Sequence, residues 1–126
     1  MRLKGRLESG FGRFSKQLTT IPLLLEAYQR KTEMSLFPGT LNVRLTEAYS
    51  MPPGALRLEK EEYFGQVSIR IVPCTILGRR GFIVRTDNIE YGVGIHPKNV
   101  IEVISNVAFR NEFGLEDGNA IEIFVE

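Results

Sequence analysis

The sharpest chemical pattern in the sequence is Gly39-Thr40-Leu41-Asn42, which opens a run of alternating polar and apolar residues from Thr40 to Leu45. Residues two apart in a strand share a face, which puts the Thr40 hydroxyl and the Asn42 amide oxygen about 7 Å apart at the backbone. Both groups are hard oxygen donors, and Mg²⁺ takes few protein ligands beside phosphate oxygens and water. The pair therefore predicts a Mg²⁺ site; the alternative is a strand whose polar face meets water.

A second pattern, Ser9-Gly10-Phe11-Gly12, follows a predicted strand and precedes Arg13 and Lys16. Glycines let backbone N–H groups approach phosphate oxygens, and nearby cations offset the phosphate charge. Such a segment is typical of a phosphate-binding turn, but it also occurs in plain surface turns.

A third pattern is the single acid Glu102 between Ile101 and Val103. In a strand its carboxyl group projects away from both neighbours, where it can accept a hydrogen bond or act as a general base, or simply face solvent. Arg110, in the short helix predicted next, can bind a phosphate bidentately or remain an ordinary surface arginine. His96 and Cys74 suggest no function.

The elements that would position these groups are mostly short strands. Five or six strands with few helices, and no regular strand–helix alternation, favour a small β-barrel over a doubly wound sheet. The candidate segments for these strands are residues 2–8, 40–45, 65–72, 75–77, 82–85, 100–104 and 121–125. Helices are predicted over 20–32 and 107–113, and loops over 46–58 and 86–99. The first helix is expected to have Thr19 or Thr20 as N-cap, and Gly78-Arg79-Arg80-Gly81 is expected to turn a hairpin.

Length and composition narrow the function further. A chain of 126 residues is expected to form one domain spanning residues 1–126. One cysteine and one histidine exclude an internal disulfide and a zinc site built from those residues. Phosphate-loop, dinucleotide-binding and G-x-S-x-G motifs are absent from the sequence. With no apolar leader or membrane-length run, we expect a cytoplasmic protein.

The net charge of +1 hides an uneven distribution. Residues 1–44 carry eight Lys and Arg against three Glu, whereas residues 45–126 carry eight against twelve acids, so the two parts are +5 and −4. The basic part can attract a polyanion such as a nucleoside triphosphate or a nucleic acid, or it can be a solvated face.

The order of the motifs resembles that of the archaeal-type, CTP-dependent riboflavin kinases. The resemblance covers nearly the whole chain, and P-G-T-L-N at 38–42 is its most specific part. It rests on S-G-F-G at 9–12, F-P-G-T-L-N-V-R-L at 37–45, V-I-E-V-I-S at 100–105 and F-G-L-E-D-G-N at 113–119. The resemblance implies an all-β fold with one or two short helices, a six-stranded cradle-loop (RIFT-type) β-barrel.

The resemblance also implies transfer of the γ-phosphoryl group of CTP to the 5′-hydroxyl of riboflavin, giving FMN and CDP. Its partners would be small molecules, without nucleic acid or membrane, and we expect a monomer. By this resemblance Thr40 and Asn42 hold Mg²⁺, and Glu102 contacts the flavin and orients or deprotonates its hydroxyl. The implied nucleotide contacts are Gly10, Phe11, Gly12, Arg13 and Phe14 in the glycine segment, and Val107, Ala108, Phe109 and Arg110 after the Glu102 strand.

Two departures from the family pattern keep an alternative open. The glycine segment is two residues shorter than the typical S-G-x-G-E-G-x-[YF] and lacks its third glycine. Gly94-Ile95-His96 stands where the family has a flavin-binding Thr ahead of a histidine. The alternative is a non-catalytic flavin- or nucleotide-binding barrel of the same ancestry, and a basic nucleic-acid-binding barrel is a third possibility.

Overall fold

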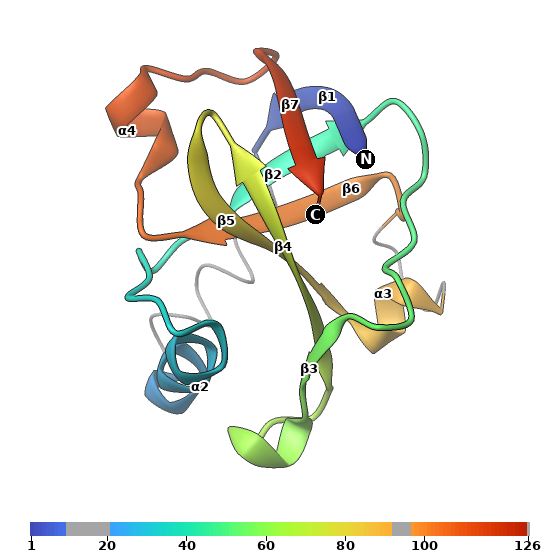
Figure 1. Cartoon of the computed structure of the whole chain (residues 1–126), viewed down its shortest axis with the longest axis vertical. Helices are drawn as coiled ribbons and strands as arrows, with labels where there is room; N and C mark the ends of the chain where they lie inside the picture. The colour runs from blue at the N-terminus through green and yellow to red at the C-terminus, as the bar shows by residue number, and fades with distance from the viewer. Residues whose placement is uncertain (10–20, 92–96, 126) are drawn as a thin grey trace.

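Antiparallel strands are the main secondary structure in a computed structural model of the protein, which describes residues 1–9, 21–91 and 97–125 (Figure 1). The strands are β1 (Arg2–Glu8), β2 (Leu41–Leu45), β3 (Leu56–Leu58), β4 (Ile69–Ile76), β5 (Arg79–Thr86), β6 (Val100–Ser105) and β7 (Ala120–Val125). The helices are α2 (Pro22–Thr32), the 3-10 helix η1 (Lys60–Glu62), α3 (Asp87–Glu90) and α4 (Phe109–Phe113). The predicted β-rich class is confirmed.

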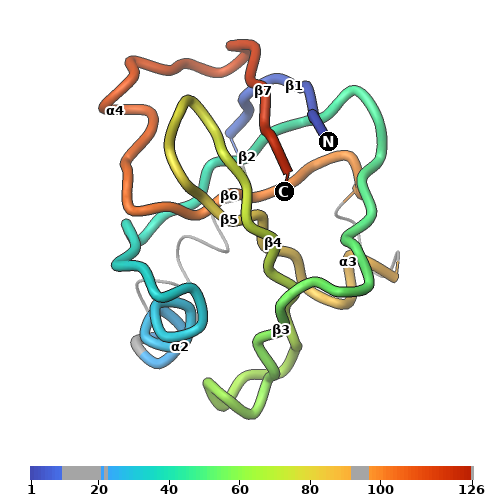
Figure 2. The backbone as a smooth tube through the Cα atoms, viewed as in Figure 1, coloured from blue at the N-terminus to red at the C-terminus, as the bar shows by residue number. Residues whose placement is uncertain are grey.

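Six of these strands close into a barrel in which each neighbouring pair is antiparallel. Their order is β4-β5-β6-β2-β1-β7, and the ring closes where β7 pairs with β4. The short strand β3 adds to β4 outside the ring and leads into an arm that extends away from the barrel (Figure 2). The predicted six-stranded barrel is therefore confirmed.

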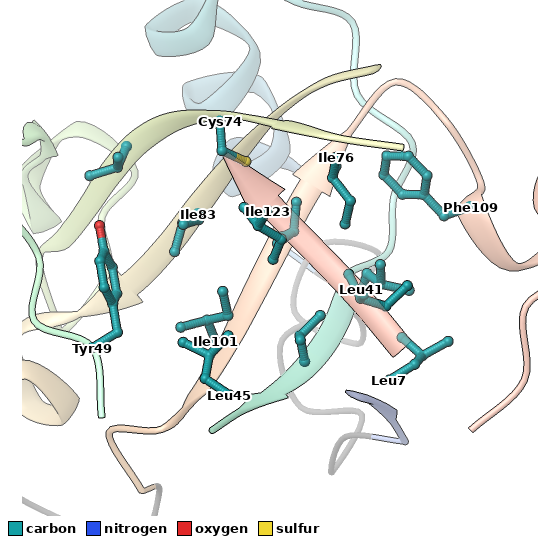
Figure 3. Close-up of a cluster of buried hydrophobic side chains, with 14 of the residues drawn as sticks. Leu7, Leu41, Leu45, Tyr49, Cys74, Ile76, Ile83, Ile101, Phe109 and Ile123 are labelled. Atoms are coloured by element: carbon teal, nitrogen blue, oxygen red, sulfur yellow. The ribbon is translucent and has the colours of Figure 1, made fainter. Parts of the chain in front are cut away.

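The barrel interior is filled by the inward residues of alternating strands. Leu41, Val43 and Leu45 of β2 all point into it, as their spacing predicts, and Figure 3 shows Leu45 beside Ile101 of β6. Burying each such side chain contributes about 1.5–3 kcal/mol. This packing fixes which side of β2 and β6 faces outward, and therefore where Asn42 and Glu102 lie.

A second apolar cluster lies on the outside of the barrel, under α2. Leu24 and Tyr28, four residues apart on one helix face, pack with Phe82 and Val84 of β5 and Ile104 of β6. Both helix residues are buried, as their spacing predicts. The helix therefore covers part of the outer face of β5 and β6, the strand that carries Glu102.

The region after residue 65 differs from its prediction. One continuous strand, β4, replaces the two predicted strands, and it passes through Pro73. Proline is tolerated there because β3 pairs with Ile69 to Ile71 and β7 with Cys74 to Ile76, so Pro73 falls in the gap between them. The hairpin turn is Leu77-Gly78, both with positive φ, and the predicted turn residues Arg79 to Gly81 belong to β5.

Helix ends and loops required smaller corrections. The N-cap of α2 is Ile21, with Pro22 at N1 and no side-chain cap, so the prediction of Thr19 or Thr20 was wrong. The second predicted helix is shorter and begins at Phe109, but it ends at Gly114 as expected. The predicted loops contain β3 and α3. Among the helices in the described ranges, none combines the length and the apolar character needed to cross a bilayer.

Candidate functional site

A pocket of about 210 Å³ lies at the end of the barrel where β2 begins and β6 ends, beside α4. Thr40, just before β2, lines one side. Val107, Ala108, Phe109 and Arg110 line another. The pocket thus brings together two groups of predicted site residues that are more than sixty positions apart in the chain. Its remaining lining residues are Phe37, Gly39, Leu41, Val103, Ser105 and Asn111.

Local hydrogen bonds shape the wall of the pocket around Thr40. The Phe37 N–H donates to the Ser105 carbonyl (2.9 Å), which ties the segment before β2 to the end of β6. A Cβ atom added at Gly39 would lie 2.9 Å from the Phe37 ring, so glycine is the residue that fits between the ring and the strand. These contacts place Thr40 at the mouth of the pocket.

Asn42 lies on the outer face of β2 but does not line the pocket. Its side chain is only 8% exposed, and no residue that the structure describes donates a hydrogen bond to its Oδ1 atom. A buried amide oxygen without a donor is costly, by about 1–3 kcal/mol, and such atoms are usually partnered. A cation is one partner that would satisfy it.

The donor set at Thr40 and Asn42 fits Mg²⁺. A threonine hydroxyl and an amide oxygen are hard ligands, and Mg²⁺ completes its octahedron with phosphate oxygens and water. The described residues hold no group of three or more His, Cys, Asp or Glu side chains that could bind a metal by themselves. A metal at Asn42 would therefore depend on oxygens brought by a ligand.

Acidic side chains flank Asn42 on both neighbouring strands. Glu8 of β1 and Glu102 of β6 are its register partners. Glu8 is already engaged, because Arg44 donates to its two carboxylate oxygens at 2.7 and 3.2 Å. Glu102 accepts no hydrogen bond within the described ranges, so it is the acid whose carboxylate stays available for chemistry.

Burial sets the acidity of Glu102. Its side chain points away from the barrel interior, as predicted. On this outer face Glu102 lies beside Val84 of β5, which packs against α2. Loss of water around the carboxylate raises the pKa of Glu102 to about 7. The group is close to Tyr28, whose own pKa is raised first by burial and then by the charge of Glu102. A carboxyl group titrating near neutrality can accept a proton at physiological pH.

The raised pKa of Glu102 predicts that the stability of the ligand-free protein depends on pH. With a pKa raised from 4.5 to about 7 on folding, Glu102 makes the folded chain bind more protons than the unfolded chain between those values. The free energy of unfolding should then fall as pH rises through this window, by at most about 3 kcal/mol, and stay low above it.

Urea unfolding from pH 4 to 8 measures this effect. Glu102→Gln should remove the fall, so the pH slope of its stability should be flatter than that of the wild type. Glu122→Gln, at an exposed position on β7, is the matched control and should keep the wild-type slope. Equal slopes in Glu102→Gln and the wild type would contradict the assignment of this pKa.

Arg110 is held at the pocket by two hydrogen bonds that a single guanidinium nitrogen donates. Its Nη2 atom donates to Asp117 Oδ1 at 2.6 Å and to the Glu8 carbonyl at 3.3 Å. Its Nε and Nη1 atoms donate to none of the residues at 1–9, 21–91 and 97–125. An anion in the pocket could therefore still be bound by the free N–H groups.

Some of the predicted site residues lie outside the part of the chain that the structure describes, and the structure adds others to the site. Gly10, Phe11, Gly12, Arg13 and Phe14, and also Gly94, Ile95 and His96, lie outside the described residues. Cys74, given no role from the sequence, is buried in the core. The sequence analysis did not single out Glu8 or Asp117 as site residues. Asp117 belongs to the F-G-L-E-D-G-N motif at 113–119, which was the one signal that could have pointed to it.

Comparison with known proteins gives a consistent match. The family model CTP-dep_RFKase, described as "Domain of unknown function DUF120", matches residues 8–125. The riboflavin kinase of Methanocella arvoryzae is 28% identical over 134 residues, covering 98% of this chain and 56% of the relative. That of Pyrobaculum arsenaticum is 32% identical over 140 residues, covering 99% and 60%. That of Ignicoccus hospitalis is 31% identical over 137 residues, covering 98% and 70%. The chain thus spans little more than half the length of the first two relatives.

Proposed function

Because this chain belongs to the riboflavin kinase family whose model it matches over residues 8–125, we propose that it phosphorylates riboflavin with CTP. The products are FMN and CDP, and the reaction requires Mg²⁺. The observation that carries the proposal is the pocket that joins Thr40 to the segment Val107–Arg110, next to the buried Asn42 oxygen. The partners are small molecules, and the reaction needs no nucleic acid.

Two side chains would hold the metal, one from β2 and one from the residue just before that strand. Thr40 supplies a hydroxyl at the pocket, and Asn42 supplies the amide oxygen that no described donor satisfies. Bound Mg²⁺ would offset the negative charge on the phosphate oxygens, which is a main requirement of phosphoryl transfer.

Arg110 and the backbone around it would bind the nucleotide. The pocket wall formed by Val107, Ala108 and Phe109 is mostly apolar, and Arg110 adds positive charge at its edge. Phosphoryl transfer depends on holding the donor and the acceptor in line, so this wall between the end of β6 and the start of α4 would contribute by positioning. The unused N–H groups of Arg110 suit a phosphate oxygen.

Glu102 would act on the acceptor. Its carboxylate can hold the 5′-hydroxyl of riboflavin by accepting a hydrogen bond, and it can take the hydroxyl proton as the new O–P bond forms and CDP leaves. Burial raises the pKa of Glu102 to about 7, which matches the pH at which a general base works well. The cost of keeping an acid there is the lower stability above neutral pH described above.

The proposal is tested by direct assay of FMN formation. Purified protein with riboflavin, Mg²⁺ and CTP should yield FMN, measured by chromatography with fluorescence detection, and removing Mg²⁺ with a chelator should stop the reaction. Parallel reactions with ATP, GTP and UTP test the choice of donor. If none of the four nucleotides gives FMN, the kinase proposal is wrong. Riboflavin binding without turnover would then favour a non-catalytic flavin-binding barrel.

A further inference from the structure

The carboxylate of Asp117 links two segments that are far apart in the sequence, and one of them lines the pocket. Asp117 lies in the turn before β7, and its Oδ2 atom accepts a hydrogen bond from the Ser9 hydroxyl at 2.7 Å. Its other oxygen, Oδ1, accepts from Arg110 Nη2 at 2.6 Å. Ser9 immediately follows β1, and Arg110 lies on α4. Asp117 therefore connects the end of β1 to the helix that lines the pocket.

The fold does not need this carboxylate. The turn is attached to β1 by backbone hydrogen bonds from Gly118 N to the Leu7 carbonyl (2.7 Å) and from Leu7 N to the Asn119 carbonyl (2.9 Å). The side chains of Arg110 and Asp117 are 39% and 54% exposed, and exposed ion pairs contribute little to stability. The contact is better explained by what it does to Arg110.

We propose that Asp117 is a positioning residue for the nucleotide, holding the Arg110 guanidinium at the pocket before a nucleoside di- or triphosphate binds there. This inference rests on the proposed function and adds a residue to it. Asp117 engages one nitrogen of Arg110, which fixes the side chain while its remaining N–H groups stay available to phosphate. Ser9 in turn fixes Asp117.

The effect of Asp117 on binding has two physical parts with opposite signs. Ordering a long side chain in advance avoids an entropic cost on binding, which for one flexible side chain corresponds to about a two- to twelvefold gain in affinity. A negative charge near the pocket also repels a polyanion, but salt screens exposed charges. We expect the ordering of Arg110 to outweigh the repulsion, so removing the Asp117 carboxylate should weaken nucleotide binding.

Support for a persistent contact comes from the electrostatics of the carboxylate. The hydrogen bond from Ser9 and then that from Arg110 keep the pKa of Asp117 below its usual value. Asp117 therefore stays ionised and able to hold Arg110 across the neutral pH range.

The test is titration calorimetry of CDP with Mg²⁺ into the wild type, four site variants and one control variant. Asp117→Ala should weaken CDP binding about two- to twelvefold and Ser9→Ala should weaken it less, while riboflavin affinity stays unchanged. Combining Asp117→Ala with Arg110→Ala should weaken binding no more than Arg110→Ala alone, because Asp117 acts through Arg110. In steady-state assays Asp117→Ala should raise KM for CTP with little change in kcat.

Glu112→Gln is the matched control. Glu112 lies on the same helix as Arg110, pairs with Arg79 of β5, is exposed to a degree similar to Asp117 and does not line the pocket. It should bind CDP as the wild type does. Equal weakening in Glu112→Gln, unchanged or tighter binding in Asp117→Ala, or additive effects in the double variant would each overturn the inference. Absence of CDP binding to the wild type itself would instead refute the proposed function.

Discussion

Replacing Thr40 with Val or Asn42 with Leu is expected to abolish Mg²⁺-dependent FMN formation while the barrel still folds. Each change keeps the approximate shape of the side chain but removes an oxygen donor at the pocket or beside it. Losing an outer-shell partner of a metal ligand typically costs 10–100-fold, so losing a ligand itself should reduce kcat/KM by more than about 100-fold.

The two variants should differ in stability. Asn42→Leu removes a buried oxygen that has no donor among the described residues, and it is expected to raise the free energy of unfolding by about 1 kcal/mol or more. Activity and urea unfolding measured on the same preparations separate loss of the site from loss of the fold. A gain in stability with a loss of turnover is the signature of a residue kept for function.

Thr75→Val on β4 is the control for these substitutions. Thr75 lies in a strand of the same barrel, pairs with Phe124 of β7 and is absent from the pocket lining. It should keep wild-type turnover and Mg²⁺ dependence. Wild-type activity in Thr40→Val or Asn42→Leu would rule out the metal site, and similar losses in Thr75→Val would show that the effect is not local.

The second large effect is expected at Arg85, where Arg85→Met should lower the free energy of unfolding by about 3–5 kcal/mol. Arg85 is 2% exposed and pairs with the buried Glu90 at 3.0 Å. Its guanidinium also donates to the backbone carbonyls of Tyr49 and Lys98. The substitution removes the cation that pairs with the buried Glu90 carboxylate and the guanidinium donors to both carbonyl groups, which is why the loss is large.

Urea unfolding at neutral pH measures this loss. Arg79→Met is the control, because Arg79 also pairs with a glutamate but is exposed, and it should cost about 0–1 kcal/mol. Adding Glu90→Leu to Arg85→Met should recover part of the loss by removing the unpaired carboxylate. A cost below about 1 kcal/mol for Arg85→Met would show that the buried pair does not hold the segments around Tyr49 and Lys98 to β5.

The sequence predicted the strands well because their signal is local. Alternation in β2 specifies which residues face the barrel, and the structure agrees for Leu41, Val43 and Leu45. The same alternation says nothing about what covers the outer face. It could not show that Asn42 is buried, or that α2 covers the face beside Glu102 and raises its pKa.

Contacts between distant segments were equally invisible. Nothing in the spacing of Arg85 and Glu90 shows that both side chains are buried. Nothing around Asp117 in the sequence shows that its carboxylate meets Ser9, more than a hundred positions away, as well as the nearby Arg110. Such pairings arise from barrel closure, which brings β1 between β2 and β7.

The gap at Pro73 has a consequence for self-association. A closed barrel hides the backbone N–H and C=O groups that could recruit a strand from another molecule, but β4 extends past β7 and leaves one stretch open. Proline removes the N–H donor there, and β3 covers the remainder with only three residues, one of them the charged Arg57. The exposed margin of the sheet is thus short, interrupted and charged, which disfavours intermolecular strand pairing and amyloid-like growth.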